Sequence, residues 1–216
     1  SLQKKIMNSN KKFISFEGID GSGKTTQINL LCEKLIKIGE KVSVFREPGG
    51  TIISEKIRGL LLDKTNYNLS SEAETLLFLA SRNQLITEKL KNKLDKGEYV
   101  IFDRFNDSTI AYQGYGFGLD IKHLKILSNF ATFGLEPYKT FFLDISVEQS
   151  LIRRSGNKSD RIEQKGEKYL NKVREGFKII AKENPKRIIE IDALNGLDEL
   201  SKFIWSKFKE IYDIKV

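Results

Sequence analysis

Two glycines, a lysine and a threonine near the N-terminus have the spacing of a phosphate-binding loop. Gly18 and Gly23 are separated by four residues, and the chain continues with Lys and Thr to give the pattern GxxxxGK[ST]. Glycines let backbone N–H groups turn inward around phosphate oxygens, and the N-terminus of a following helix adds positive potential. The pattern predicts a nucleoside triphosphate site formed by Gly18, Ile19, Asp20, Gly21, Ser22, Gly23, Lys24, Thr25 and Thr26.

The same loop supplies groups for a metal ion and for phosphoryl transfer. Lys24 is expected to bridge the β- and γ-phosphates, while Thr25 binds Mg²⁺ through its hydroxyl and Thr26 contacts the α-phosphate. A carboxylate is needed near the metal, and Asp103 follows an apolar stretch directly. An apolar strand that ends in aspartate is common, but in the same sheet as a phosphate loop it favours a metal site. We therefore predict Mg²⁺ at Thr25 and Asp103.

Short apolar stretches that alternate with helical periodicity predict the frame that positions this loop. The expected strands are residues 13–16, 42–45, 99–102, 140–143 and 188–191. The expected helices are residues 24–38, 71–96, 121–132, 167–183 and 198–212. This alternation predicts an α/β fold with a five-stranded parallel sheet and helices on both faces.

Two helix starts are predicted from short motifs. Ser71 with Glu74, and Ser146 with Gln149, have the spacing of a capping box, in which the two side chains bond to each other's backbone N–H groups. Both motifs precede helical periodicity, so we expect helices to begin there.

Length and composition favour a single domain. The chain has 216 residues, 39% of them hydrophobic and 31% charged, which is near the globular average. No linker or repeat divides it, so residues 1–216 are predicted to form one domain, with residues 1–11 flexible. There is no apolar stretch of about 18 residues and no signal core, and the single Cys32 is expected to be structural. A cytoplasmic location without membrane contact is predicted.

The basic charge balance leaves a second class of function open. The net charge is +8, from 37 basic and 29 acidic residues. A nucleotide-dependent module that binds DNA or RNA would have such a balance, and it would show salt-sensitive polynucleotide binding with little turnover of free nucleotides. Many of the lysines are scattered through helices, which is typical of solvated surface. We therefore expect no nucleic-acid partner.

Two further segments have both a chemical and an ordinary interpretation. Arg46 follows the second predicted strand at the sheet edge where ligands bind, but REPGGT also reads as a turn with a surface arginine and glutamate. Phe78 and Arg82 are four residues apart, which places them on one helix face. They fit a base-binding face, or a core phenylalanine beside a surface arginine.

Five ordered blocks settle the family that the chain resembles. FEGIDGSGKTT, REPGGT, LLFLASRNQ, DRFNDSTIAYQG and DRIE follow one another as in thymidylate kinases of the bacterial style, and they span most of the chain. The resemblance implies a three-layer P-loop kinase fold with a short basic lid. It also implies Mg²⁺-dependent phosphoryl transfer from ATP to dTMP, giving ADP and dTDP for dTTP synthesis, and a homodimer.

The resemblance also implies roles at the acceptor phosphate and sugar. Arg46 would grip the 5′-phosphate of the acceptor, with Arg104 beside it, and both offer planar charge-assisted forks. Asp20 would accept from the 3′-hydroxyl of the deoxyribose. Tyr112 would crowd the sugar and disfavour a 2′-hydroxyl.

The base is expected to be read by four side chains. By resemblance, Phe78 stacks on the thymine ring and Arg82 reaches a base carbonyl. Thr109 and Gln113, again four residues apart, read the pyrimidine N3 and the neighbouring edge. Exchange of these side chains would change the acceptor and leave the phosphate chemistry intact, so a kinase of another or broader nucleoside monophosphate is the main alternative.

A basic segment at about residues 153–163 resembles the family's lid. Arg153, Arg154 and Arg161 would supply charge to the transition state when the lid closes over the phosphates. In some relatives an arginine inside the phosphate loop does this, but here Gly21 occupies that place. The lid is therefore expected to compensate.

Overall fold

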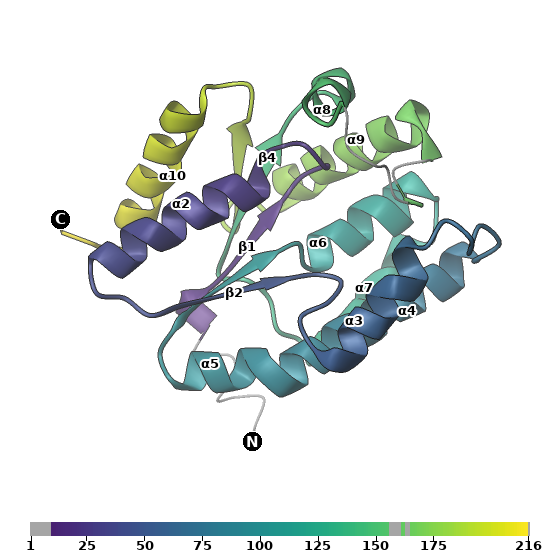
Figure 1. The fold of residues 1–216 in the computed structure, drawn as a ribbon, viewed down its shortest axis with the longest axis horizontal. Helices are drawn as coiled ribbons and strands as arrows, with labels where there is room; N and C mark the ends of the chain where they lie inside the picture. The colour runs from purple at the N-terminus through teal and green to yellow at the C-terminus, as the bar shows by residue number, and fades with distance from the viewer. Residues whose placement is uncertain (1–9, 156–160, 163–164, 216) are drawn as a thin grey trace.

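The predicted strands form one parallel sheet in the order β2-β3-β1-β4-β5 (Figure 1). The structure, a computed structural model, describes residues 10–155, 161–162 and 165–215. The fold class is thus confirmed. The strands are β1 (Phe13–Glu17), β2 (Val42–Arg46), β3 (Tyr99–Asp103), β4 (Lys139–Asp144) and β5 (Ile188–Asp192).

Every strand continues one residue beyond its predicted C-terminal end, and that extra residue is charged. Parallel pairing runs from Val42 opposite Tyr99 through to Arg46 opposite Asp103, and Asp144 lies opposite Asp192 in the same way. The apolar pattern could not mark these residues, because their backbone belongs to the sheet while their side chains are charged. The C-terminal edge of the sheet is therefore lined with charges.

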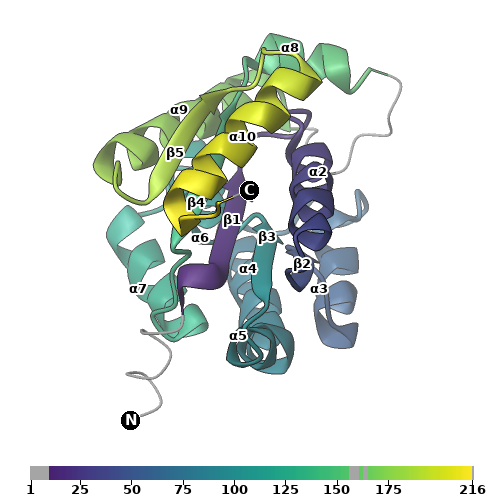
Figure 2. The same cartoon turned by 90° about the vertical axis from the view of Figure 1, so that its left-hand side faces the viewer.

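The helices cover both faces of the sheet (Figures 1 and 2). The structure has α2 (Lys24–Lys37), α3 (Ile52–Leu62), α4 (Ser71–Leu85), α5 (Lys91–Asp95), α6 (Asn106–Thr109), α7 (Ile121–Thr132), α8 (Val147–Arg153), α9 (Glu167–Glu183) and α10 (Leu197–Tyr212), with a 3₁₀ turn η1 (Asn10–Lys12). The π-helical segment η2 (Ile86–Leu90) joins α4 to α5, so the predicted helix 71–96 is one rod with a bulge. A second π-helical segment, η3 (Ile110–Gly116), continues α6.

Strand alternation divides the core into two layers. Ile14 and Ile101 belong to the apolar cluster that includes α2, α9 and α10, and α2 and α10 pack against each other. Phe13 and Val100, one residue before each of these, belong to a second cluster with η2 and α5. Because successive side chains in a strand point to opposite faces, one short strand anchors both layers and fixes the position of the sheet edge that carries the charges.

One predicted capping box is confirmed in part and the other is wrong by one residue. Ser146 caps α8, since its hydroxyl accepts from the backbone N–H of Gln149 at 3.2 Å. At α4 the cap is Ser70, which accepts from the N–H of Ala73 at 3.1 Å, because the chain is extended at Ser70 and already helical at Ser71. Glu74 plays no capping role, and its carboxylate is buried elsewhere.

Two other expectations concern the ends and surroundings of the chain. The predicted flexible segment 1–11 lies outside the described residues except for its last two, which are in η1. Of the helices in the described part, none is long and apolar enough to cross a bilayer.

Candidate active site

A cavity of about 690 Å³ opens at the C-terminal edge of the sheet. It begins at the phosphate loop and extends to α4 and η3. Most of the predicted site residues line it: Asp20, Gly21, Ser22, Gly23, Lys24, Thr25, Thr26, Arg46, Phe78, Arg82, Asp103, Arg104, Thr109, Tyr112, Gln113, Arg153 and Arg154. Gly18, Ile19 and Arg161 do not line it; Ile19 is a core residue.

The phosphate loop is held by backbone geometry. Gly18 has a φ of 136°, and a Cβ there would lie 2.4 Å from the carbonyl oxygen of Leu143, so glycine is required. The ammonium of Lys24 donates to the carbonyls of Gly18 and Ile19, at 2.9 and 3.1 Å. Burial, followed by the nearby Arg104 charge, lowers the pKa of Lys24 to about 8. The lysine is thus desolvated and ready to pair with an anion.

Thr25 and Asp103 meet as predicted for a metal site. The hydroxyl of Thr25 donates to Oδ2 of Asp103 at 2.9 Å, although the two residues are 78 positions apart in the chain. A hydroxyl and a carboxylate are the hard oxygen ligands that Mg²⁺ prefers when it also binds phosphates. The donor set therefore fits the predicted ion.

Arg104 connects the DRF segment to the phosphate loop. Its backbone has a φ of 74°, which is unusual for a residue with a side chain. The guanidinium donates to the carbonyl of Gly18 at 2.9 Å and to Oδ1 of Asp20 at 2.6 Å, and it lies 5.1 Å from the ring centre of Tyr112. Burial would raise the pKa of Asp20, but the charges of Arg104 and Lys24 outweigh it and hold that pKa at about 2.

A buried acid that the sequence analysis missed anchors this segment. Glu17, the last residue of β1, accepts from the backbone N–H of Phe105 at 2.7 Å and bonds to the hydroxyl of Ser108 at 2.6 Å. Burial and the neighbouring Asp107 charge raise the pKa of Glu17 to about 8. Through these two hydrogen bonds Glu17 stabilises the turn in which Arg104 has a positive φ.

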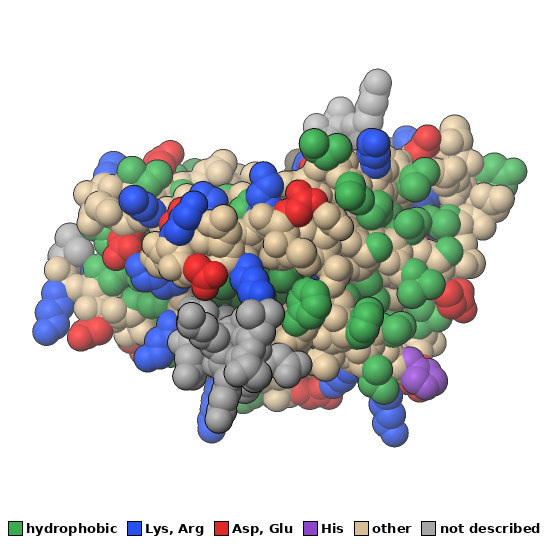
Figure 3. All heavy atoms as spheres, turned by 90° about the horizontal axis from the view of Figure 1, so that it is seen from below, with side chains coloured by type: hydrophobic (Ala, Val, Ile, Leu, Met, Phe, Trp, Pro, Cys, Tyr) green, Lys and Arg blue, Asp and Glu red, His purple; other side chains and the backbone are tan. Residues whose placement is uncertain are grey.

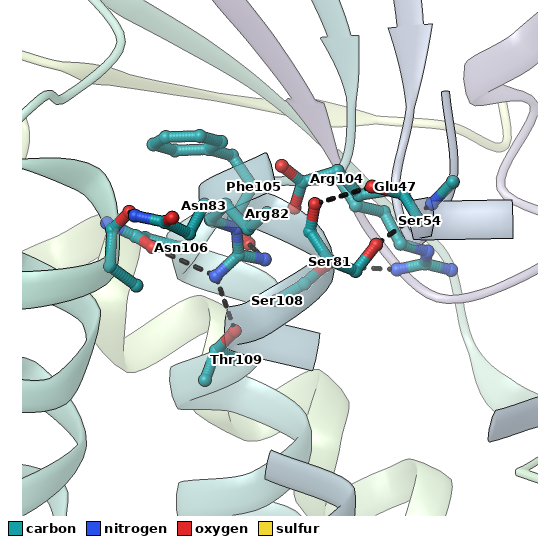
Figure 4. A network of polar contacts seen from close by, with 12 residues as sticks. Glu47, Ser54, Ser81, Arg82, Asn83, Arg104, Phe105, Asn106, Ser108 and Thr109 are labelled. Atoms are coloured by element: carbon teal, nitrogen blue, oxygen red, sulfur yellow. Dashed lines mark hydrogen bonds and ion pairs between the residues drawn. The ribbon is translucent and has the colours of Figure 1, made fainter. Parts of the chain in front are cut away.

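Arg82 lies in a buried polar network at the other end of the cavity (Figure 4). It is 2% exposed, and its Nε donates to Glu47 at 2.6 Å. Its Nη1 donates to Asn106 at 2.9 Å and to the hydroxyl of Thr109 at 2.8 Å, and Nη2 donates to the carbonyl of Phe105 at 3.0 Å. The surface interpretation of Arg82 is wrong. Its predicted contact with a base stays a prediction.

The partner of Arg82 is a second buried acid that the sequence analysis did not identify. Glu47 follows β2 directly, in the REPGGT block, and its interpretation as a surface residue is wrong. Burial raises the pKa of Glu47 to about 7 even though Arg82 opposes this shift. Arg46, by contrast, is about half exposed and lies 3.5 Å from Glu55, with its side chain lining the cavity. Neighbouring residues of one turn therefore have different roles.

Glu74 is a third buried acid, and it binds part of the predicted lid. Its carboxylate is 0% exposed and accepts from the guanidinium of Arg161, from Lys165 at 3.1 Å and from the side-chain amide of Gln113 at 3.0 Å. Arg161 also donates to the carbonyl of Leu61 at 2.8 Å. In this structure Arg161 therefore lies against α3 and α4 and away from the phosphate loop.

The other lid arginines lie at the cavity. Arg153 donates to the carbonyls of Ala193, at 2.7 Å, and Gly21, at 3.4 Å, and Arg154 lines the cavity beside Gly21. Residues 156–160 and 163 of the predicted lid lie outside the described residues. The structure thus brings two of the three predicted arginines to the phosphate loop.

Several cavity residues had no sequence signal. Ala193 and Asn195, from the turn between β5 and α10, and Leu197, the first residue of α10, line the cavity. Neutral side chains in a turn carry no pattern that indicates a ligand. Arg58 of α3 also lines the cavity and donates to the carbonyl of Pro48 at 3.0 Å.

The strand order, the glycine loop and the Lys24–Thr25–Asp103 cluster define a P-loop enzyme that handles nucleotide phosphates. The family model described as thymidylate kinase matches residues 16–204. Thymidylate kinases from Thermoanaerobacter sp. (strain X514) and Thermosipho melanesiensis are 46% and 47% identical, over 94% and 93% of this chain and 96% and 97% of theirs. The crystal structure of thymidylate kinase from Ehrlichia chaffeensis has a TM-score of 0.74 and 37% identity, covering 91% of this chain and 97% of that one.

The chain belongs to the thymidylate kinase family. It is an enzyme, a transferase of the nucleotide kinase type, and the family that the five sequence blocks indicate is confirmed. The thymidylate kinase interpretation is thereby favoured over both alternatives, a kinase with another acceptor and a module that binds nucleic acid.

Proposed function

We propose that this chain transfers the γ-phosphoryl group of ATP to the 5′-phosphate of dTMP, giving ADP and dTDP. The observation that carries the proposal is the continuity of the cavity, which joins the phosphate loop at Lys24 to a pocket lined by Phe78 and Gln113. A donor at the loop and a pyrimidine nucleotide in the pocket would therefore face each other. Family membership supports the same pair of substrates.

The reaction needs no covalent intermediate on the protein. An oxygen of the acceptor's phosphate attacks the γ-phosphorus in line while the bond from that phosphorus to the β–γ bridging oxygen breaks and ADP leaves. Lys24 and Arg153 offer positive charge to the transferring group, and Arg46 holds the acceptor phosphate. Catalysis is thus positioning and neutralisation of charge.

Magnesium is proposed as the metal, held by Thr25 and Asp103 together with phosphate oxygens. The 2.9 Å contact between these two side chains supports a shared ligand position. When bound, Mg²⁺ supplies positive charge to the β- and γ-phosphates.

A homodimer is proposed from exposed apolar side chains on α3, α4 and α7. Leu76 is 56% exposed, Ile126 65% and Phe130 81%, and Figure 3 shows hydrophobic side chains gathered on the face that carries the histidine. A contiguous apolar surface of this kind favours burial against a second copy. Sedimentation velocity should give twice the chain mass, and Phe130→Asp should lower it to the mass of one chain. We also propose a cytoplasmic location, where ATP is available and the single Cys32 stays reduced.

The activity is tested by ADP formation from ATP and Mg²⁺ with dTMP, dUMP, dCMP, AMP or GMP offered separately. We expect the highest kcat/KM with dTMP. Comparable activity with a purine monophosphate would contradict the proposal and would favour a kinase of broader acceptor range. Salt-sensitive polynucleotide binding with no transfer to any acceptor would favour the nucleic-acid-binding alternative.

A further inference from the structure

We propose that Glu74 fixes the amide orientation of Gln113, and that the acceptor site thereby selects a base with a ring N–H over one with a bare ring nitrogen. Glu74 is then a positioning residue for specificity between thymine or uracil and cytosine. The inference rests on the proposed function, in which a pyrimidine nucleotide occupies this end of the cavity.

The contacts of Glu74 divide between its two oxygens. Arg161 and Lys165 both donate to Oε2, so the two cations lie on one side of the carboxylate. Oε1 accepts from Nε2 of Gln113 at 3.0 Å. The carboxylate is 0% exposed, so no water competes for Oε1 at this contact.

This contact determines which end of the Gln113 amide faces the cavity. A carboxylate paired with cations offers only acceptors, so Nε2 must face Glu74 and Oε1 must face away from it. Turning the amide over would place its oxygen against Oε1 of Glu74 in a buried site. Both oxygens are acceptors, so neither would have a hydrogen-bond donor, which is unfavourable. Gln113 is 2% exposed and lines the cavity, and no described residue donates to its Oε1. The cavity therefore receives an acceptor.

Thr109, one helical turn earlier, presents the opposite polarity. Its hydroxyl oxygen accepts from Nη1 of Arg82 at 2.8 Å, and within the described residues its own proton has no acceptor. The hydroxyl proton is therefore available to the cavity as a donor. Thr109 thus offers a donor, and Glu74 fixes an acceptor at Gln113.

Thymine and uracil match this pair, and cytosine does not. The edge of thymine or uracil carries an N3–H donor beside a carbonyl acceptor. Cytosine carries a bare N3 beside an amino donor, so Oε1 of Gln113 would face a lone pair in place of a proton. The 5-methyl group of thymine plays no part in this discrimination.

Glu74→Gln is the sharpest test. The new amide will turn its oxygen toward Arg161 and Lys165 and its NH₂ group toward Gln113, whose amide must then turn over and present a donor to the cavity. We expect the ratio of kcat/KM for dTMP over dCMP to fall by at least about tenfold, the effect of one mispaired buried polar group. The ratio for dTMP over dUMP should not change, because both bases carry N3–H.

Lys165→Met is the matched control. It removes one cation from Oε2 and leaves the contact between Oε1 and Gln113, so both ratios should stay at their wild-type values. Gln113→Met removes the acceptor without putting a donor in its place, so it should lower the dTMP-to-dCMP ratio, but by less than Glu74→Gln does. Combining the two changes should lower it no further, because both act through one amide. Gln113→Met also tests the contact if the Glu74→Gln chain does not fold.

An equal loss of kcat/KM for dTMP, dUMP and dCMP in Glu74→Gln would overturn the inference, as would additive effects in the double variant. Either result leaves the proposed function intact, because the wild-type chain still phosphorylates dTMP. A wild-type chain that transfers phosphate to neither dTMP nor dUMP would overturn the proposed function and this inference together.

Discussion

The two ends of the cavity are formed by different kinds of groups. At the phosphate end, backbone groups of residues 18–26 and the side chain of Lys24 form the site, and nearly everything needed lies in one short segment. At the base end, Arg82 and Gln113 are held by Glu47 and Glu74, two acids buried almost completely. In the proposed function, the first arrangement binds the triphosphate of the donor and the second sets the choice of acceptor.

The electrostatics of the two ends also differ. At the phosphate end, the charges of Arg104 and Lys24 hold the pKa of Asp20 at about 2, so an anionic side chain coexists with cations. At the base end, burial raises the pKa of Glu47 to about 7 despite the Arg82 guanidinium. The desolvated charged cluster of Lys24, Arg104 and Asp20 fits the binding of phosphate groups. The buried hydrogen-bonded network around Arg82 fits the proposed contact with a neutral base.

The largest effect is expected at the phosphate end. Lys24→Met should lower kcat at least about 1,000-fold, because a desolvated positive charge at the transferring group is lost. ADP release with dTMP measures it. Lys34→Met is a matched control on the same helix, where the ammonium bonds to Ser201 away from the cavity, and its kcat should stay within about twofold of wild type. A similar loss of kcat in both variants would contradict a specific role of Lys24 at the phosphate end.

The next effect is on stability and belongs to the base end. Arg82→Met should lower the free energy of unfolding by about 3 kcal/mol, because it leaves Glu47 and the carbonyl of Phe105 buried without their donor. Arg46→Met, whose pair with Glu55 is about half exposed, should cost less than about 1 kcal/mol. Urea unfolding of both variants measures the difference, and equal losses would show that the buried network contributes no more than a surface pair.

A pH dependence of stability should separate the two ends further. Glu17 and Glu47 keep a proton in the folded chain that the unfolded chain releases near the ordinary pKa of 4.5. Stability from this source is therefore fully present below about pH 4.5 and is lost as pH rises through about 7 for Glu47 and about 8 for Glu17. The melting temperature of the chain should therefore decrease as the pH is raised from 5 to 9.

Glutamine variants of Glu17 and Glu47 show how much each side chain contributes to this decrease in melting temperature. Glu47→Gln should flatten the curve up to about pH 7, and Glu17→Gln should flatten it up to about pH 8, since an amide keeps the bonds and does not titrate. Circular dichroism melts at each pH give the curves. Unchanged slopes in both variants would mean that other groups carry the pH dependence.

The smallest effect concerns the start of α4, the helix that carries Glu74 and Phe78. Ser70→Ala should cost about 1 kcal/mol, because the N–H of Ala73 loses its acceptor. Ser71→Ala, in the first turn of the helix, should change stability by no more than a few tenths of a kcal/mol. Urea unfolding distinguishes them, and the reverse order would restore the capping box at Ser71 and Glu74.

The same division explains what the sequence could predict. The phosphate loop, the parallel sheet and the pairing of Thr25 with Asp103 follow from local patterns and from the rule that ligands bind at the C-terminal edge of such a sheet. The three-residue spacing from Ser71 predicts a capping role for Glu74. Its true partners, Gln113 and Lys165, are 39 and 91 positions away. No pattern within one helix contains that information.

Glu47 and Arg161 also have partners that local sequence patterns could not predict. A glutamate next to a Pro-Gly-Gly turn is typical of surface, but Arg82, 35 positions later in the chain, donates to Glu47 at 2.6 Å and makes it a buried partner. The basic segment around Arg161 predicts a place in the lid, yet its guanidinium lies against Glu74 and Leu61. Burial of a charge is decided by long-range packing, so the residue type alone misleads.

A crystal structure of the chain with dTMP, Mg²⁺ and a non-hydrolysable ATP analogue tests the central claim most directly. The account predicts the triphosphate on the loop at Lys24, the thymine ring against Phe78, and its N3 within hydrogen-bond distance of Oε1 of Gln113, whose Nε2 still bonds to Glu74. A thymine ring elsewhere in the cavity, or a Gln113 amide that presents Nε2 to the base, would contradict the account.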